Sequence, residues 1–155
     1  MTPQICKLML LATLGWGAAC GPSFHQPTPK NFVKLKDQER YSYRAVTADG
    51  LVYAVKELEH SPKGDLNFWT KAVENKLRFQ TGYALLHKTN VATSGGLQGM
   101  QLQFGFDRGK TPHLYYVTVF TTDDHIFVLE AGGAKDLMDA HKVELDAALK
   151  SFRLD

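Results

Sequence analysis

Three closely spaced β-type segments in the second half of the chain constrain its fold most. Between Leu97 and Phe106 apolar and polar residues alternate, which is the period of a strand. This puts four apolar side chains on one face: Met100, Leu102, Phe104 and Phe106. The segments 113–121 and 126–131 are dense in aromatic and β-branched residues, and only short turn sequences separate the three. Because short turns join antiparallel strands, we expect an antiparallel sheet.

The first half adds further strands. Residues 41–47 and 51–58 flank the turn sequence Ala48-Asp49-Gly50, which predicts a hairpin. A weaker strand is expected at 32–35, and another at 83–91.

Two helices are predicted by apolar residues at helical spacing. Asp65 can accept from first-turn amides and so start a helix, and Gly82 is placed to end it with a positive φ. Its apolar positions are Leu66, Trp69, Val73 and Leu77. A last helix over 135–151 follows Gly132-Gly133, with Met138, His141, Leu145, Ala148, Leu149 and Phe152 as its stripe. The pattern predicts an α+β domain with both amphipathic helices on one face of the sheet.

The N-terminal residues predict export. Lys7 precedes a short apolar run over 8–14, which small residues then follow. This is the pattern of a secretory signal over 1–19, and the run is too short to span a membrane, which takes about 20 apolar residues. The signal ends in Gly17-Ala18-Ala19-Cys20.

That ending resembles the lipobox of bacterial lipoproteins, although Gly17 stands where Leu is usual. The resemblance implies that Cys20 carries a lipid and that the domain lies in the periplasm or at the cell surface. Gly21, where some bacteria read an Asp as a retention signal, favours the outer membrane. The alternative is ordinary cleavage after Ala19, leaving a free cysteine. Three prolines over 21–30 predict an extended tether, with a single domain over 31–155.

Charge argues against nucleic acid as a partner. The chain has 18 basic and 16 acidic side chains, a net charge of +2 that falls by one when Lys7 leaves with the signal. A nearly neutral chain without a basic run lacks the electrostatic attraction that nucleic-acid binding uses.

The C-terminal half resembles the PsbP-like family, named for an extrinsic photosystem protein and also found in small bacterial lipoproteins. The resemblance lies in Gly96-Leu97-Gln98-Gly99-Met100, in the segments 114–120 and 126–132, and in Ala148-Leu149-Lys150-Ser151-Phe152-Arg153. It implies an α/β/α sandwich and an accessory or binding role. The family brings no catalytic set, and nothing in the chain supports a photosynthetic role.

No residue pattern predicts catalysis, a metal site or a cofactor. The six histidines lack metal-binding spacing, and Asp123-Asp124-His125 is typical of a solvated turn. Strand aromatics left uncovered by the helices would form a binding surface. The candidates are Trp69, Tyr115, Tyr116 and Phe104, with Trp69 also a candidate core residue.

We therefore expect a non-enzymatic envelope lipoprotein that binds a partner protein. One alternative is a small-ligand carrier with a pocket between sheet and helices. Another is an envelope hydrolase, which needs His113, His125 or His87 to converge with acidic residues.

Overall fold

The computed structural model describes residues 23–36, 38 and 40–155. The predicted signal, Cys20 and the start of the predicted tether lie outside the described residues. None of the described helices is long and apolar enough to cross a membrane.

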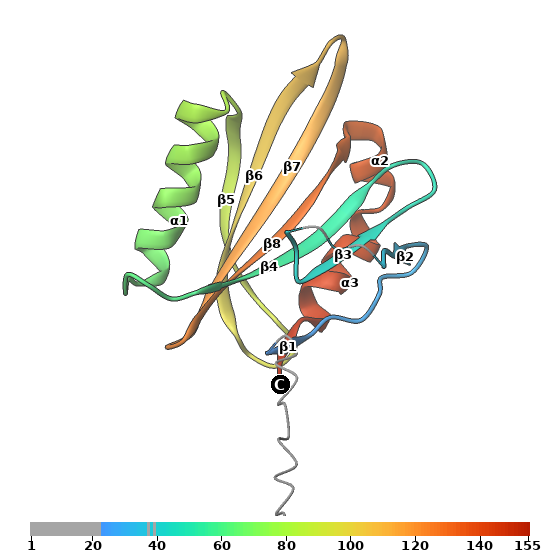
Figure 1. Ribbon diagram of the computed structural model, residues 1–155. Helices are drawn as coiled ribbons and strands as arrows, with labels where there is room; N and C mark the ends of the chain where they lie inside the picture. Colours follow the sequence, from blue (N-terminus) through green and yellow to red (C-terminus); the bar gives the residue numbers. More distant parts are fainter. Residues whose placement is uncertain (1–22, 37, 39) are drawn as a thin grey trace, which may run out of the picture.

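A seven-stranded sheet with the order β2-β3-β4-β8-β7-β6-β5 forms the centre of the fold (Figure 1). All of its neighbouring strands are antiparallel, as predicted. Its strands are β2 (Val33–Lys34), β3 (Tyr43–Val46), β4 (Val52–Glu59), β5 (Ala84–Ala92), β6 (Gln98–Arg108), β7 (Thr111–Thr121) and β8 (His125–Ala134).

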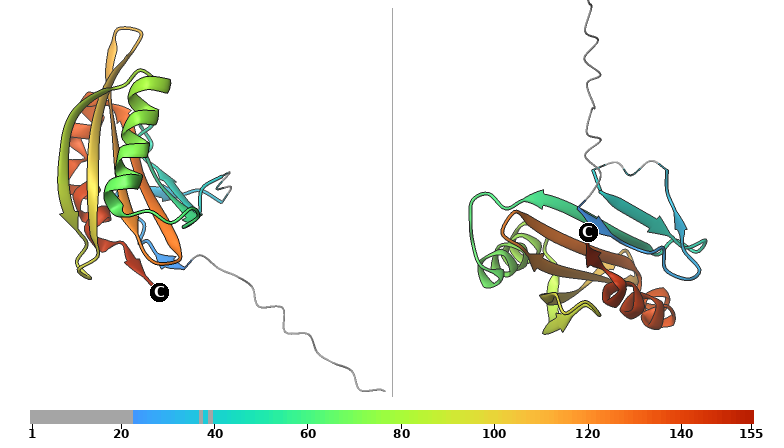
Figure 2. Two further views of the ribbon diagram at one scale, coloured as in Figure 1. Left: turned by 90° about the vertical axis from the view of Figure 1, so that its left-hand side faces the viewer. Right: turned by 90° about the horizontal axis from the view of Figure 1, so that it is seen from below.

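Helices cover both faces of this sheet (Figure 2). On one face lies α1 (Leu66–Asn75), continued by the π-helical turn η1 (Lys76–Gln80). On the other lie α2 (Lys135–Ala140) and α3 (Lys142–Ser151). The expectation that both helices share one face is therefore wrong. The central strands bury apolar side chains on both faces, so each face needs a covering layer.

The two faces have separate apolar layers. On the α1 face the sheet contributes Val117, Val119, Ile126 and Val128. These side chains pack against Leu66, Trp69 and Val73 of α1 and against Leu77 of η1. On the other face Phe120 and Phe127 of the sheet meet Phe152 at the end of α3. The rings of Phe120 and Phe152 stack with centroids 5.6 Å apart.

The predicted tether is part of the folded domain from Phe24 on. Strand β1 (Phe24–His25) pairs with β9 (Arg153–Leu154), and the buried Phe24 ring lies 5.4 Å from that of Phe152. Gln26 is also buried, and its amide accepts from Tyr53 Oη at 3.1 Å. The side chains of Phe24 and Gln26 therefore fix this part of the segment to the domain.

The predicted start and end of the first helix are confirmed, whereas the last helix differs from its prediction. Asp65 Oδ1 accepts from the Phe68 amide at 2.7 Å and starts α1, and Gly82 follows η1 with φ of +78°. The last helix is not continuous. It breaks at His141, whose φ of −100° and ψ of 15° separate α2 from α3.

Candidate binding cleft beside helix α1

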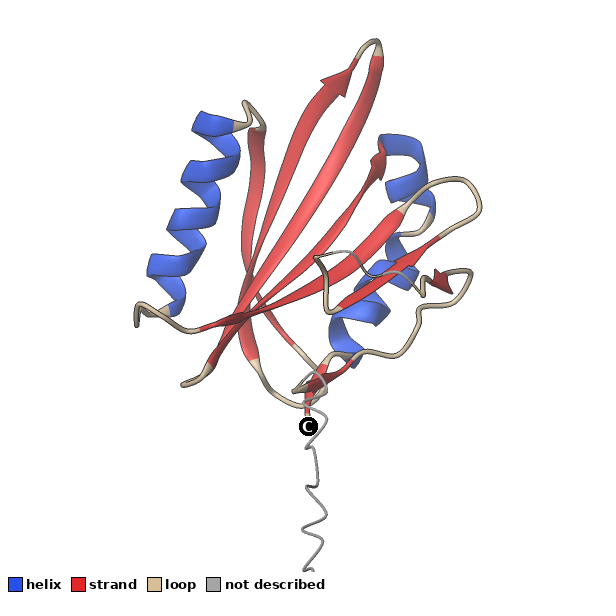
Figure 3. Ribbon diagram, in the orientation of Figure 1, coloured by secondary structure: helices blue, strands red, loops and turns tan. Residues whose placement is uncertain are grey.

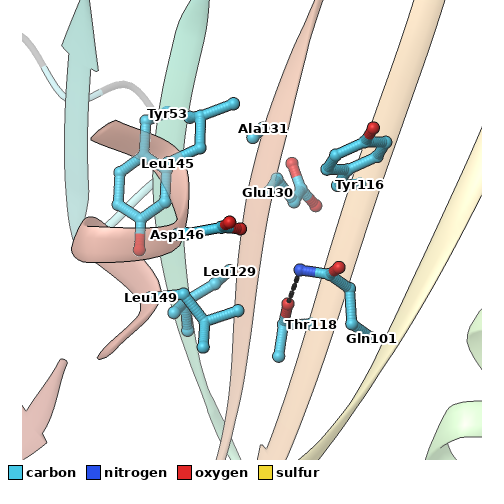
Figure 4. A pocket seen from close by; sticks show the side chains of 10 residues that line it. All are labelled: Tyr53, Gln101, Tyr116, Thr118, Leu129, Glu130, Ala131, Leu145, Asp146 and Leu149. Atoms are coloured by element: carbon cyan, nitrogen blue, oxygen red, sulfur yellow. Dashed lines mark hydrogen bonds between the residues drawn. The ribbon is translucent and has the colours of Figure 1, made fainter. Parts of the chain in front are cut away.

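The interface between α3 and the centre of the sheet is closed. Its small pocket is lined by Tyr53, Tyr116, Leu129, Leu145 and Leu149, among others (Figure 4), and holds about 20 Å³. That is room for about one water molecule. The Gln101 amide donates to Thr118 Oγ1 at 3.2 Å across its wall. This central part of the interface therefore has no space for a ligand, whereas a hollow of about 350 Å³ lies further out, between α3 and the strands β5 and β6.

The interface between α1 and the sheet is open along one side. Helix α1 packs on β6 and β7, which leaves a cleft of about 260 Å³ over β4 and β8. We call it the α1 cleft. Its apolar lining consists of Leu58, Val73, Leu77, Tyr115, Val117 and Val128, and its charged lining of Lys56, Lys76 and Glu130.

A buried carboxylate lies at the sheet side of this cleft. The Glu130 side chain is only 11% exposed, and its Oε1 accepts from Lys56 Nζ at 2.7 Å. Its Oε2 accepts from Tyr41 Oη at 3.1 Å, and, after burial itself, the negative charge of Glu130 is one cause that raises the pKa of the nearby Tyr115. The Lys56 ammonium also lies 4.6 Å from the centre of the Tyr41 ring. We call these four residues the Glu130 cluster.

Strand register explains why these residues meet. Glu130 is opposite Ala54 in β4 and opposite Val117 in β7. Lys56, two residues after Ala54, and Tyr115, two residues before Val117, are therefore diagonal neighbours of Glu130 on the same face, within reach of long side chains.

The tyrosines of the cluster stay protonated at neutral pH. Burial, reinforced by the nearby negative charge of Glu130, raises the pKa of Tyr41 and raises that of Tyr115 further. Both hydroxyls can thus donate to the carboxylate. Lys56 and Tyr41 each donate to one of its oxygens, so the carboxylate is satisfied and forms a fixed polar edge to the apolar cleft.

An aromatic row continues from Tyr115 toward the outer end of the β6–β7 hairpin, which extends beyond the neighbouring strands (Figure 3). Tyr83 lies edge-on to Tyr115 at 5.9 Å and stacks on Phe106 at 4.2 Å. Phe106 in turn lies 5.3 Å from His113. Tyr115 packs tightly against Gly132, where an added Cβ would lie 3.0 Å from its ring.

The structure does not bring the four predicted surface residues together. Tyr115 lines the α1 cleft. Trp69 is half-buried in the layer under α1, with its ring 5.2 Å from that of Phe68. Phe104 is fully buried and offers no exposed ring, and Tyr116 lies on the α3 face.

Sequence reasoning did not find Lys56, Tyr41 or Glu130. The available signal was a glutamate in the middle of the otherwise apolar segment 126–131. A carboxylate at such a position needs a partner when buried, but the sequence does not show which residue that is.

The histidines proposed for a hydrolase lie apart. His125 Nε2 is 3.5 Å from Glu57 Oε1, but this carboxylate also accepts from the backbone amide of Ser23 at 3.2 Å and from its hydroxyl. His87 is on the edge strand β5 and His113 near the start of β7. Over the described ranges, no three His, Cys, Asp or Glu side chains are grouped to hold a metal ion.

Neither a scan of protein-family models nor a search of curated proteins finds a match for this chain. Several solved structures share its fold. LpqN of Mycobacterium tuberculosis, described as involved in cell envelope biogenesis, is 10% identical with a TM-score of 0.72, over 89% of this chain and 87% of LpqN.

Two further structures are similar over most of their length. The Ran-binding protein Mog1p of Saccharomyces cerevisiae has a TM-score of 0.57 at 13% identity, over 88% of this chain and 92% of Mog1p. Cyanobacterial PsbP of Synechocystis sp. PCC 6803 has a TM-score of 0.52 at 12% identity, over 93% of this chain and all of the other. The fold is therefore a PsbP-like α/β/α sandwich, as the sequence resemblance implied.

Proposed function

We propose that this protein is a lipid-anchored, non-enzymatic binding module of the bacterial cell envelope that binds a partner protein through the α1 cleft. The observation that carries the proposal is the cleft itself, in which an apolar floor ends at the buried Glu130 cluster. The role that LpqN has in envelope biogenesis supports the location, and the lipobox-like Gly17-Ala18-Ala19-Cys20 supports the anchor.

The size of the cleft favours protein contacts over a free ligand. Pockets for drug-sized ligands measure about 300–1,000 Å³, whereas this cleft holds about 260 Å³. It suits one or two apolar side chains of a partner, which would enter between Leu77 and Val128. Leu58 at its edge is 47% exposed, and Phe79 on η1 is also exposed, so the contact surface extends beyond the cleft.

The charges around the cleft indicate what kind of partner surface it can contact. Lys56 and Lys76 line the cleft beside the apolar residues, and Glu130 already neutralises Lys56. A suitable partner therefore has an apolar residue, which would enter the cleft, next to an acidic residue, which would pair with Lys76 at its edge.

The two alternatives have less support. A carrier with a pocket between sheet and helices has only about 20 Å³ at the centre of the α3 interface, and the hollow of about 350 Å³ beside it lies at the rim, between α3 and the outer strands. A hydrolase lacks support because His87, His113 and His125 lie on different parts of the sheet.

Two measurements test the proposal. Membrane fractionation of the wild type and of Cys20→Ser tests the anchor, and we expect only the variant in the soluble fraction. Copurification from solubilised envelope tests the cleft. Leu58→Glu should lose the partner, while Val143→Glu, at a 78% exposed position on α3, should retain it. Equal recovery with both variants would contradict the role of the cleft.

A further inference from the structure

Strand β5 forms an open edge of the sheet. It pairs with β6 alone, and no described strand pairs with its other side. The left panel of Figure 2 shows this edge facing the viewer with no segment over it. The strand has nine residues, about every second of which directs its N–H and C=O outward. An edge of this length can accept another strand unless something blocks it.

The edge is blocked only near its start. A bulge at Leu86 interrupts the pairing with β6, after which the register runs unbroken from His87 opposite Gln103 to Ala92 opposite Gln98. No proline occurs in the strand. Leu86 itself is 59% exposed and lies over Gly105, where a Cβ would come within 3.0 Å of its Cδ1.

Two hollows follow this edge on the face that carries α2 and α3. One, of about 600 Å³, is lined by Leu86, Gly105, Pro112 and Leu114, among others. The second, of about 350 Å³, lies between the outer strands and α3, where Val91 and Leu149 are its apolar contacts among polar side chains such as Thr89 and Gln101. A strand added to β5 would place every second side chain on this face, about 7 Å apart. Backbone pairing combined with side-chain hollows is the arrangement by which sheet edges bind extended peptides.

The charges near the edge indicate what kind of strand it accepts. On the α1 face beside this edge, three cations share one carboxylate: Glu74 lies 3.8 Å from Lys88 and 3.1 Å from both Lys71 and Arg78, so positive charge is in excess there. Lys88 is opposite Leu102 and so lies on the α1 face, away from the hollows. A second copy of β5 would add another Lys88 and no acidic side chain to an edge that already has an excess of cations.

We propose that β5 binds an extended segment of a partner protein in which apolar and acidic residues alternate. The apolar side chains lie over the two hollows, and the acidic ones lie beside Lys88 on the opposite face. This inference rests on the proposed role in protein binding, but it uses a different surface from the α1 cleft.

Amide hydrogen exchange of the ¹⁵N-labelled full chain tests it. The probe is an acetylated nonapeptide, Thr-Val-Glu-Val-Glu-Val-Glu-Phe-Thr, and the control peptide has Lys at each Glu. The Glu peptide should slow exchange at alternate amides of β5, and it should bind at least about tenfold more tightly than the Lys peptide. Lys88→Gln should weaken its binding about two- to fivefold, and Lys30→Gln, at an exposed position before β2, should not.

Unchanged exchange in β5, or equal binding of the two peptides, would overturn the inference. Protection of β5 that grows with protein concentration alone would also overturn it, because the occupant would then be a second copy. If the peptide fails while Leu58→Glu still abolishes copurification, this inference fails and the proposed function stands.

Discussion

The Lys56 ammonium lies 2.7 Å from the Glu130 carboxylate, diagonally across the boundary between β4 and β8. This pair introduces charge into a face of the sheet that is otherwise apolar beneath α1. Removing one partner of a mostly buried pair leaves the other charge uncompensated.

Lys56→Met should therefore lower the free energy of unfolding by about 1–3 kcal/mol, less than for a fully buried pair because Lys56 is partly exposed. The double variant Lys56→Met/Glu130→Leu should recover most of that loss. Urea denaturation of both single variants and the double variant measures the coupling. Additive losses would show that the two side chains do not depend on each other.

Alkaline pH should destabilise the protein through its tyrosines. Burial is the largest cause raising the pKa of Tyr41, Tyr43, Tyr53, Tyr115 and Tyr116. A group with a raised folded-state pKa contributes stability below its unfolded pKa, about 10 for tyrosine, and loses it as pH rises toward the folded value.

Tyrosinate absorbance should therefore rise together with unfolding above about pH 10, and Tyr115→Phe should reduce the slope of stability against pH in that range. The matched control is Tyr83→Phe. Ionisation of most tyrosines near pH 10 without loss of structure would contradict this expectation.

Trp69 should contribute more to stability than its neighbour Phe68. Trp69 packs in the layer between α1 and the sheet, whereas Phe68 is 53% exposed. Trp69→Ala should lower the free energy of unfolding by about 2–4 kcal/mol, and Phe68→Ala by less than about 1 kcal/mol. Thermal unfolding of the two variants compares them. Similar losses would mean that Trp69 is not the anchor of the helix.

The main strands along the chain and their antiparallel pairing through short turns were predictable from sequence, because alternating apolar residues mark a strand and short turns join neighbours. The contact between β4 and β8 was not. The α1 start was predictable as well, because Asp65 acts within its own first turn. Two further features were not. Gly132-Gly133 suggested an end to β8, yet both residues lie within the strand. Glycine suits both positions because Tyr115 and Leu51 lie close to where their side chains would be. The Glu130 cluster depends on register between strands far apart in the chain, which local patterns do not fix.

Phe24 provides a test of how the N-terminal segment joins the domain. Its ring contacts Phe127 and Phe152, so Phe24→Ala should lower the free energy of unfolding by about 2–4 kcal/mol. His25→Ala, which changes an exposed neighbour, is the matched control. A negligible effect of Phe24→Ala in urea denaturation would mean that residues 24–30 act as a free tether after all.

The central claim, that the α1 cleft is the surface that contacts a partner protein, is tested most directly by site-specific photo-crosslinking in intact cells. A photoreactive amino acid at Leu58 should give one discrete adduct with an envelope protein, and the same group at Val143 should give none. The Leu58 adduct should disappear when Val128→Glu places a charge in the cleft floor of a chain that remains folded by circular dichroism. Absence of an adduct from Leu58, or the same adduct from both positions, would contradict the claim.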